Sequence, residues 1–444
     1  MKTIRPIDGM DIAESVRFEP GSYLLPRGVR IVRDAVNIDG AGATLIGENQ
    51  SGRGICVEGR SDCAIRGVSM RDYYHGIHAR DCQGLQISDC DISRTGEIAS
   101  NTIFLDIWLT AEESYGGAVC LINCSDAAIQ RSRLEHQMNG ILTYGCSRLE
   151  MNCNLCNYNS GWGIHLYNTC DSVFESNSCD YCCRFEPREG GPYYGHMGAD
   201  AAGFLAVMNS SRNKFIRNTA RMGGDGFFLA GMSPDFKLCA CDDNLFEEND
   251  ASLSPNIAFE ATFSKGNVFR KNIADRCNYG FWCGFSTGFV IEENRILWNR
   301  QAGIAVENGT GFVAENNKFQ ANGHGILLWS REQGPFGATV PDRATCCDWL
   351  IRKNDFHSNG KGIRIASNQD HGIRNAQRTA VRPHDNKIVE NDIQDNRVGI
   401  DLFMADRTEI RANTINRNVE SNICDADGCD NVVANNLGAA GAYL

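Results

Sequence analysis

The sequence lacks any apolar run long enough to cross a bilayer, and it is poor in positive charge. No stretch of roughly 18 or more consecutive apolar residues occurs, so no membrane-spanning helix is expected. Lysine and arginine number 43 against 55 aspartates and glutamates, which gives a formal net charge of −12. Nucleic acids and anionic membrane surfaces both attract basic patches, so neither is expected as a partner.

The N-terminal residues also lack the apolar segment of a secretory signal peptide. Residues 1–18 read MKTIRPIDGMDIAESVRF, in which charged residues interrupt every short apolar run. We therefore expect a cytoplasmic protein, or a secreted one if the sequence is a processed form.

What the sequence does contain is a short repeat that begins with glycine. GFWCGF at Gly280, GIAVEN at Gly303 and GILLWS at Gly325 follow one another at spacings of 23 and 22 residues. Apolar and variable residues alternate in each copy with period two, which is typical of a β-strand with one buried face. This alternation predicts that Ile304 and Val306 point inward.

Similar copies extend from residue 54 to the C-terminal region, and a second signature separates them. It has the form Asn-x-[Phe/Ile]-x-x-Asn, as in NKFIRN at Asn213 and NVFRKN at Asn267. Asn tolerates a left-handed backbone and can hydrogen-bond to the next copy of itself, so it suits the corner of a coil. A period of about 22 residues with two or three short strands predicts one coil of a parallel β-helix.

These repeats, with the N-terminal segment FEPGSYLLPRGVRIVRDAVNIDGAGATLIG, resemble the right-handed parallel β-helix proteins of the pectin-lyase-like superfamily, including NosD-like repeat proteins. The resemblance implies an all-β fold, a single right-handed parallel β-helix of about 14 coils. Residues 1–50 are expected to form a lead-in or cap, and residues 51–444 the β-helix. The superfamily includes hydrolases, lyases, epimerases, tailspikes and binders, so it does not define one reaction. Such β-helices often form side-by-side trimers, which makes a homo-oligomer a candidate assembly.

Cysteine is abundant, with 21 residues. Several cysteines fall just beyond a repeat strand, and we expect them to stack as small buried thiols in a corner of the coil. These are Cys63, Cys82, Cys124, Cys146 and Cys170. No second pair at zinc-site spacing accompanies the CxxC motif at Cys153 and Cys156, so neither a metal site nor a cofactor is expected.

Five periods carry insertions, which fall at the two ends of the glycine strands. Residues 96–115 and 184–201 precede such a strand, whereas residues 232–242, 331–348 and 368–385 follow one. Long loops on a rigid scaffold commonly build binding sites, so we expect them to wall a groove over the outward face.

The predicted floor of this groove is aromatic, small and sparsely charged, which is typical of a sugar-binding surface. It consists of the residues two and four positions after each glycine. The candidate substrate-binding residues on the floor and the adjoining insertion are His165, Tyr167, Tyr194, His196, Trp282, Trp329 and Arg364. In the alternative interpretation, the two tryptophans pack under the loops as a satellite core.

Two pairs of carboxylates are candidate catalytic residues. Glu260 and Glu307 are predicted to occupy the same strand position two coils apart, with Gly284 between them. Two coils correspond to about 9.6 Å, close to the ~6.5–9.5 Å of inverting glycosidases. Asp200 and Asp225 begin neighbouring glycine strands, and one coil (~5 Å) suits a retaining pair or a shared proton. An aspartate at such a glycine-rich position can also be a turn residue.

The preferred hypothesis is a glycoside hydrolase that cleaves a neutral oligo- or polysaccharide with paired carboxylates. A lyase or epimerase acting on uronate glycans is the first alternative, with His165 or His196 as base and Tyr167 or Tyr194 as acid. Such an enzyme needs cations or a metal to neutralise the sugar carboxylate, and the predicted floor offers only Arg364 and His165. The second alternative is a non-catalytic carbohydrate-binding solenoid, in which the carboxylates are replaceable and the tryptophans are not.

Overall fold

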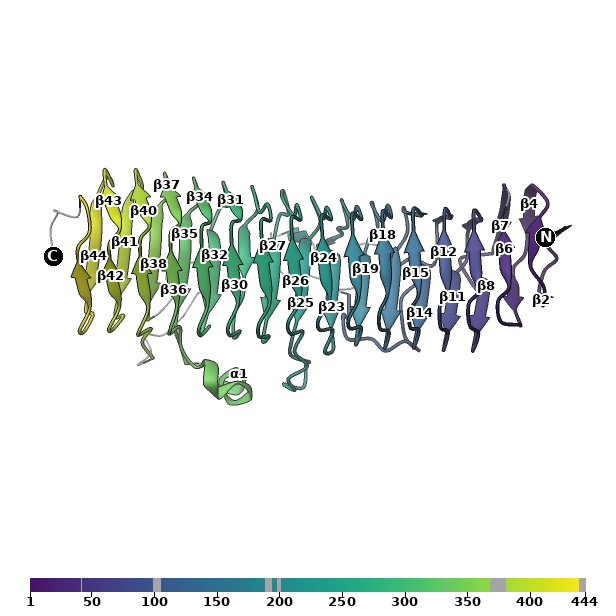
Figure 1. Ribbon diagram of the computed structural model, residues 1–444, viewed down its shortest axis with the longest axis horizontal. Helices are drawn as coiled ribbons and strands as arrows, with labels where there is room; N and C mark the ends of the chain where they lie inside the picture. The colour runs from purple at the N-terminus through teal and green to yellow at the C-terminus, as the bar shows by residue number, and fades with distance from the viewer. Residues whose placement is uncertain are drawn as a thin grey trace. The chain divides into compact units, whose positions relative to one another are not determined.

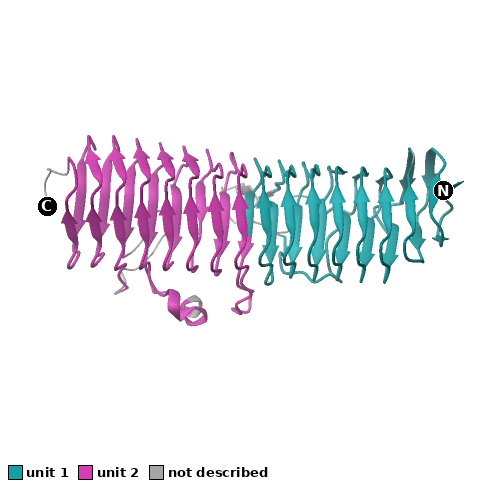
Figure 2. Cartoon of the chain, in the orientation of Figure 1, with its two compact units in different colours: residues 1–228 teal, residues 229–444 magenta. Residues whose placement is uncertain are grey.

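The computed structural model describes residues 1–40, 42–98, 105–187, 194–197, 201–332, 334–367 and 381–438. The chain forms two compact units, residues 1–228 and 229–444 (Figure 2). Within each unit, successive coils of the chain stack as parallel strands (Figure 1). The predicted all-β parallel β-helix is therefore confirmed.

Each coil contributes strands to parallel sheets, here called sheets 1, 2 and 3, of which sheet 1 contains the glycine strands. In unit 1, sheet 1 contains β2 (Met10–Ile12), β5 (Val29–Ile31), β8 (Arg53–Glu58), β11 (His75–Arg80), β14 (Gly117–Ile122), β17 (Ile141–Tyr144), β19 (Trp162–Tyr167) and β23 (Ala202–Val207). Strand β25 (Asp225–Ala230) contains the boundary between the units.

Sheet 2 of unit 1 contains β1 (Lys2–Ile4), β3 (Val16–Phe18), β6 (Asn37–Asp39), β9 (Ala64–Arg66), β12 (Gln86–Ser88), β15 (Ala128–Gln130), β18 (Glu150–Asn152), β20 (Val173–Glu175) and β24 (Lys214–Ile216). Its sheet 3 contains β4 (Gly21–Leu24), β7 (Ala43–Ile46), β10 (Ser69–Arg71), β13 (Asp91–Ser93) and β16 (Arg133–Leu134). An antiparallel pair, β21 (Phe185–Pro187) and β22 (Tyr194–Met197), stands outside the coils.

In unit 2, sheet 1 contains β27 (Ile257–Thr262), β29 (Tyr279–Trp282), β32 (Ala302–Glu307), β35 (His324–Trp329), β38 (Lys361–Ala366), β41 (Val398–Phe403) and β44 (Ser421–Ala426). Sheet 2 contains β26 (Leu245–Glu247), β28 (Val268–Arg270), β30 (Val290–Glu292), β33 (Val313–Glu315), β36 (Leu350–Arg352), β39 (Lys387–Val389), β42 (Glu409–Arg411) and β45 (Val432–Ala434). Sheet 3 contains β31 (Arg295–Leu297), β34 (Lys318–Gln320), β37 (Asp355–His357), β40 (Asp392–Gln394) and β43 (Thr414–Asn416).

The strands of residues 1–50 pair in the same parallel manner as the later ones. Strands β5, β6 and β7 pair with β8, β9 and β10, one in each sheet. The N-terminal segment therefore adds coils of its own to unit 1. Its role as a cap stays a prediction.

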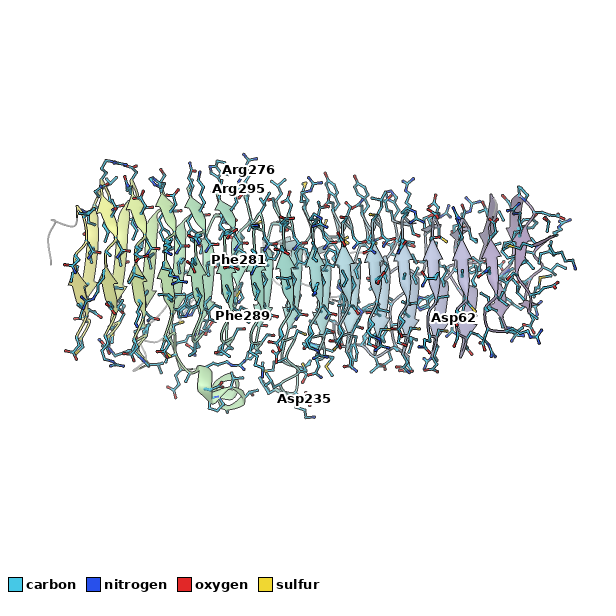
Figure 3. All side chains as sticks on the ribbon, viewed as in Figure 1. Asp62, Asp235, Arg276, Phe281, Phe289 and Arg295 are labelled. Carbon is cyan, nitrogen blue, oxygen red and sulfur yellow. The ribbon has the colours of Figure 1, made fainter. Side chains whose placement is uncertain are left out.

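The interior of the coils is apolar, as the period-two alternation predicts. Ile304 and Val306 point inward and have no exposed surface. Aromatic residues from successive coils also stack inside unit 2, and the rings of Phe259 and Phe281 lie 5.0 Å apart. Figure 3 shows Phe281 within the coil. Because each inward side chain packs on the aligned side chain of the next coil, these positions stay apolar, although the residue changes from Phe281 to Ile304 along the stack.

The asparagines of the second signature form ladders along the corners, as predicted. In unit 2, the backbone N–H of Asn272 donates to Oδ1 of Asn294 at 2.8 Å. The side chain of Asn294 in turn donates to Oδ1 of Asn317 at 2.9 Å and to the carbonyl of Phe269 at 2.9 Å. Each buried amide thus satisfies backbone groups of the neighbouring coils, which would otherwise lie unpaired away from water.

The cysteine stack is confirmed for four of the five predicted cysteines, whereas Cys170 is only partly buried. Cys63, Cys82, Cys124 and Cys146 are buried, and the backbone N–H of Cys124 donates to Sγ of Cys146 at 3.4 Å. The contact with Cys146 raises the pKa of Cys124 to about 12. These cysteines are free thiols, so they act as small apolar side chains that pack one corner of unit 1.

Two insertions of unit 2 contact each other at the end of the sheet 1 strands. The 232–242 insertion forms an antiparallel bridge, and the 331–348 insertion contains helix α1 (Gly334–Thr339) and the 3₁₀ turn Pro341–Arg343. The Thr339 hydroxyl donates to the Phe236 carbonyl at 3.2 Å, and Val340 packs with Met232. Figure 1 shows α1 projecting from the coils, and Figure 3 shows Asp235 in the neighbouring insertion. These loops therefore form a wall.

Replacement of Asn294 tests the ladder. The variant Asn294→Ala leaves buried donors and acceptors on both adjacent coils without a partner, at about 1–3 kcal/mol for each group. We expect the free energy of unfolding of unit 2 to fall by roughly 3 kcal/mol, measured by urea denaturation. Exposed Lys318, one coil further, provides the control, because Lys318→Ala should change stability by less than about 0.5 kcal/mol. Equal effects of the two substitutions would argue against the ladder as a stabilising element.

Candidate functional site

The outward face of sheet 1 in unit 1 gathers cationic and imidazole side chains on two neighbouring strands. His75 pairs with Arg53, His78 pairs with Cys56, and Arg80 pairs with Glu58 across β11 and β8. The ring centroids of His75 and His78 lie 5.8 Å apart. The two histidines are three positions apart, yet both line the same cavity.

These side chains line a cavity of about 630 Å³. Its floor comes from β8 and β11, and its walls come from the turn at residues 50–52 and from residues 111–114 of the 96–115 insertion. The lining residues are Gln50, Ser51, Gly52, Arg53, Tyr74, His75, His78, Arg80, Ala111, Glu112, Glu113 and Ser114. A concave site with a few convergent polar groups is typical of a ligand-binding pocket.

Tyr74 fixes the insertion against the floor. Its hydroxyl donates to the Ser114 carbonyl at 2.8 Å, and its own carbonyl accepts the N–H of Gly117 at 3.2 Å. A Cβ on Gly96 would come within 2.3 Å of the Tyr74 ring, so only glycine fits beside it. The pocket wall therefore depends on local packing that places Tyr74 at the rim.

The two histidines of the pocket are neutral at physiological pH. Burial, His78 and Arg53 lower the pKa of His75 to about 3. Burial, Arg53 and Arg80 lower the pKa of His78 to about 4. Burial raises the pKa of Tyr74, so its hydroxyl keeps its proton. Neutral imidazoles, a protonated phenol and two guanidinium groups are the components of proton-transfer chemistry beside an anion.

Sequence reasoning missed this pocket. The floor was predicted only from His165 onward, although GIHARD at Gly76 already places His78 and Arg80 two and four positions after a glycine. His75 could not be found in that way, because it precedes the glycine.

Two predicted binding residues of unit 1, His165 and Tyr167, lie further along the same face in an aromatic cluster. The His165 ring stacks on Trp162 at 4.6 Å, and Tyr144 lies 5.2 Å from His165 and 5.5 Å from Tyr167. His165 is only 1% exposed, and burial lowers its pKa to about 3. The structure therefore brings His165 and Tyr167 together, with His165 as a buried packing residue.

The remaining candidate residues of unit 1 are only partly covered by the described part of the structure. Tyr194 and His196 lie on β22, and their side chains are not among the described ones. Asp200 lies outside the described residues. Asp225 begins β25, is fully buried, and its N–H donates to the Ala201 carbonyl at 3.0 Å. The Asp200–Asp225 pair therefore stays a prediction.

The predicted alignment of Glu260 and Glu307 in unit 2 was wrong. Glu260 pairs with Trp282, and Trp282 pairs with Ala305, whereas Glu307 pairs with Trp329. The two glutamates lie two coils apart and two residues out of register, so their Cα atoms are about 12 Å apart. The error arose because β27 carries Ala258 at the glycine position, while the sequence was aligned from Asn256.

The two glutamates also differ in their electrostatics. Burial of its carboxyl group raises the pKa of Glu260 to about 8, so Glu260 is protonated at neutral pH. Glu307 is 6% exposed and pairs with Arg331, whose Nε lies 2.5 Å from Oε1. Glu260 is therefore a potential general acid, whereas Glu307 is held in an ion pair from the 331–348 insertion.

The predicted binding residues of unit 2 form two groups. Trp282 and Trp329 pack together with centroids 5.4 Å apart, over Ala302, Ala305 and Leu327. Trp329 has no exposed surface, so it belongs to a satellite core and cannot offer a ring face to a sugar. Trp282 is partly exposed.

Arg364, the cationic residue of the predicted floor, is engaged in an ion pair. It contacts the Asp401 carboxylate on the next coil, which Lys361 also contacts. Arg364 is 6% exposed. The guanidinium group of Arg364 is therefore paired with a carboxylate of the protein itself.

Among the described residues, Asp355, His357 and Asp392 could together hold a metal ion. Their ligand atoms all lie within 4.8 Å of one another, on β37 and β40 of sheet 3. The three side chains are partly exposed, and His357 Nε2 already contacts Asp355 Oδ1 at 2.7 Å. Exposed acidic groups of this kind also occur without a metal, so the cluster carries no assignment.

A family model described as the right handed beta helix region matches residues 109–250 and 236–336, which together make up more than half of the chain. The chain belongs to the right-handed β-helix family. This membership confirms the resemblance found in the sequence. No curated protein sequence is significantly similar to this β-helix protein. None of the helices in the described ranges is long and apolar enough to span a membrane.

Several solved structures are similar to this β-helix protein at low identity. A variant of the periplasmic alginate epimerase AlgG is 13% identical over 94% of this chain and 79% of its own, with a TM-score of 0.41. The A-module of the mannuronan epimerase AlgE4 from Azotobacter vinelandii is 13% identical over 96% and 91%, also at 0.41. DFA-IIIase from Arthrobacter chlorophenolicus A6 is 12% identical over 64% and 70%, again at 0.41.

The buried imidazole of His165 should make the stability of unit 1 depend on pH. Its pKa of about 3 in the folded protein compares with about 6.5 in an unfolded chain. The unfolded state therefore binds the proton more readily, and stability falls as the pH drops from about 6.5 to about 3. At pH 4.5 the titration of His165 should lower the free energy of unfolding of unit 1 by about 2.7 kcal/mol relative to neutral pH. The variant His165→Gln should lack this part of the decrease.

Urea denaturation at pH 7 and pH 4.5 measures this effect. The control is His384→Gln, which changes a partly exposed histidine and should keep the loss seen in the wild type. An undiminished loss in His165→Gln would show that His165 is not the responsible group.

Proposed function

We propose that this β-helix protein is a carbohydrate-active enzyme that removes the proton next to the carboxylate of a uronate residue, as a lyase or an epimerase. The observation that carries this proposal is the unit 1 pocket, whose lining includes His75, His78, Arg53, Arg80 and Tyr74. This differs from the preferred hypothesis drawn from the sequence, because the register of Glu260 and Glu307 does not assemble the expected pair.

The chemistry requires a base, an acid and a positive charge. His78 accepts the C5 proton of the uronate, and the Arg53 guanidinium offsets the negative charge that develops on the carboxylate. In elimination, the electrons of the C5–H bond form a C4–C5 double bond as the C4–O bond breaks. The Tyr74 hydroxyl, once it releases the Ser114 carbonyl, protonates the leaving oxygen. In epimerisation, C5 instead regains a proton on its opposite face. A planar guanidinium matches the two oxygens of a carboxylate.

The low pKa of His78 makes it a weak base in the free protein. It is lowered by burial and by the charges of Arg53 and Arg80. A bound carboxylate offsets those charges, so the pKa of His78 should rise in the complex and make the imidazole a better base. The substrate would thus improve the base that acts on it.

Replacement of His78 tests the proposal directly. We expect His78→Gln to lower kcat by at least about a hundredfold on polyuronates, because general-base catalysis typically contributes that much. Elimination is measured by the ultraviolet absorbance of the unsaturated product, and epimerisation by incorporation of solvent deuterium at C5. His384→Gln, in unit 2, serves as the matched control and should keep full activity. Binding of a glycan with neither signal would favour the non-catalytic solenoid.

Hydrolysis of a neutral glycan is a second candidate function, favoured by the protonated Glu260. Its pKa of about 8 predicts that an enzyme using it as general acid loses kcat/KM as the pH rises above about 8. A base with the pKa of His78 predicts instead a loss at acid pH. New reducing ends without ultraviolet absorbance, abolished in Glu260→Gln and lost above pH 8, would establish hydrolysis. Activity that survives in Glu260→Gln would exclude this role.

A further inference from the structure

We propose that unit 1 binds an extended chain of pyranose sugars on an exposed aromatic ridge, which lies outside the pocket. The ridge consists of His136, Tyr158, Tyr181 and Met222, which occupy the corner between sheets 3 and 1 on four successive coils. Binding at the ridge requires no reaction in the pocket, so this proposal goes beyond the proposed function.

The rings of the ridge stack on one another from coil to coil. The His136 and Tyr158 rings are parallel within 3°, with centroids 5.1 Å apart, and the Tyr158 and Tyr181 rings are parallel within 9° at 4.8 Å. Stacked rings touch at about 3.5 Å, so these centroid distances mean that neighbouring rings are offset sideways by about 3–4 Å. Part of each ring face is therefore uncovered, and Tyr158 is 49% exposed and Tyr181 41% exposed.

The coil itself does not require aromatic residues at this corner. All four ridge residues have φ between 55° and 60°, a left-handed backbone that is unfavourable for bulky side chains. The same corner position holds Arg94 in unit 1 and Ser358 and Asp395 in unit 2, with φ of 55°, 57° and 57°. Bulky side chains that are kept exposed at such a position indicate a functional surface.

A row of planar polar groups accompanies the ridge. Glu135, Asn157 and Asp180 each directly precede a ridge residue in the sequence. The Asn157 side chain donates to Glu135 Oε1 at 2.8 Å and accepts the N–H of Asp180 at 2.8 Å. Glu135 is also paired with Arg133 at 2.6 Å. Asp180 is paired with Arg221 at 2.7 Å. The row is therefore held in place with its charges balanced, and aromatic faces beside fixed polar groups suit a sugar.

The size of the ridge favours a narrow ligand over a folded partner. Its apolar members, Tyr158, Tyr181 and Met222, are 40–49% exposed. A large side chain has about 150–250 Å² of surface, so together they offer roughly 300 Å², well below the ~800 Å² per partner of a stable protein interface. Successive coils are about 4.8 Å apart, which is close to the length of one pyranose in an extended chain. Successive sugars can therefore meet successive rings.

Isothermal titration calorimetry of the full chain with a hexasaccharide of 1,4-linked glucose tests the proposal. This probe lacks the carboxylate that the pocket is proposed to bind. We expect Tyr158→Ser to raise the Kd about tenfold, because it removes the central ring of the stack. Tyr158→Phe keeps the ring and should change the Kd by less than about twofold. His78→Gln should leave the Kd unchanged, which separates the ridge from the pocket.

The matched control is Phe236→Ser in the 232–242 insertion of unit 2. Phe236 is also an exposed aromatic residue, at 45%, with φ of 60°, and its replacement should not alter the Kd. Urea denaturation verifies that each variant is folded. No binding by the wild type, or an equal loss in Phe236→Ser, would overturn the proposal. A lower sedimentation mass of Tyr158→Ser with unchanged glycan affinity would also overturn it, and would assign the ridge to contact between copies of the chain.

Discussion

Parallel hydrogen bonding between successive coils is the constraint on which the rest of the structure depends. It aligns each residue with a counterpart about 4.8 Å away on the next coil, so like side chains stack on like. The Asn272–Asn294–Asn317 ladder and the Phe259–Phe281 stack are two results of the same alignment. Every coil repeats this alignment. An error in the register of one strand therefore changes which outward-facing residues are neighbours.

The candidate site depends on this alignment in a direct way. His75 and His78 are brought to Arg53 by the pairing of β11 with β8, and the pocket becomes concave only because an insertion stands beside those strands. The coils supply a rigid floor, and the insertion supplies the wall and the two glutamates. Sites on repeat proteins commonly divide their parts in this way between a scaffold and its loops.

The fold could be predicted from the sequence, and so could some of the residues on the outward face of sheet 1. The inward direction of Ile304 and Val306, the asparagine ladders and the cysteine stack all follow from short-range patterns that every coil repeats. The register of Glu260 did not follow, because Ala258 replaces the glycine that marks the strand and the alternation alone permits a shift of two residues. The contact of Tyr74 with Ser114 was also beyond prediction, since it depends on how a non-repeating insertion folds back.

The corner occupied by Cys82, Cys124 and Cys146 has a practical consequence. A thiol reagent reacts with the thiolate, and these three sulfur atoms are buried. The neighbouring thiols also raise the pKa of Cys82 and of Cys124, which keeps those two protonated. Modification therefore has to wait until the coils at that corner separate. The rate of labelling reports how often this part of unit 1 opens while the rest of the protein stays folded. Thiol labelling of the stacked cysteines therefore measures local unfolding at this corner of unit 1.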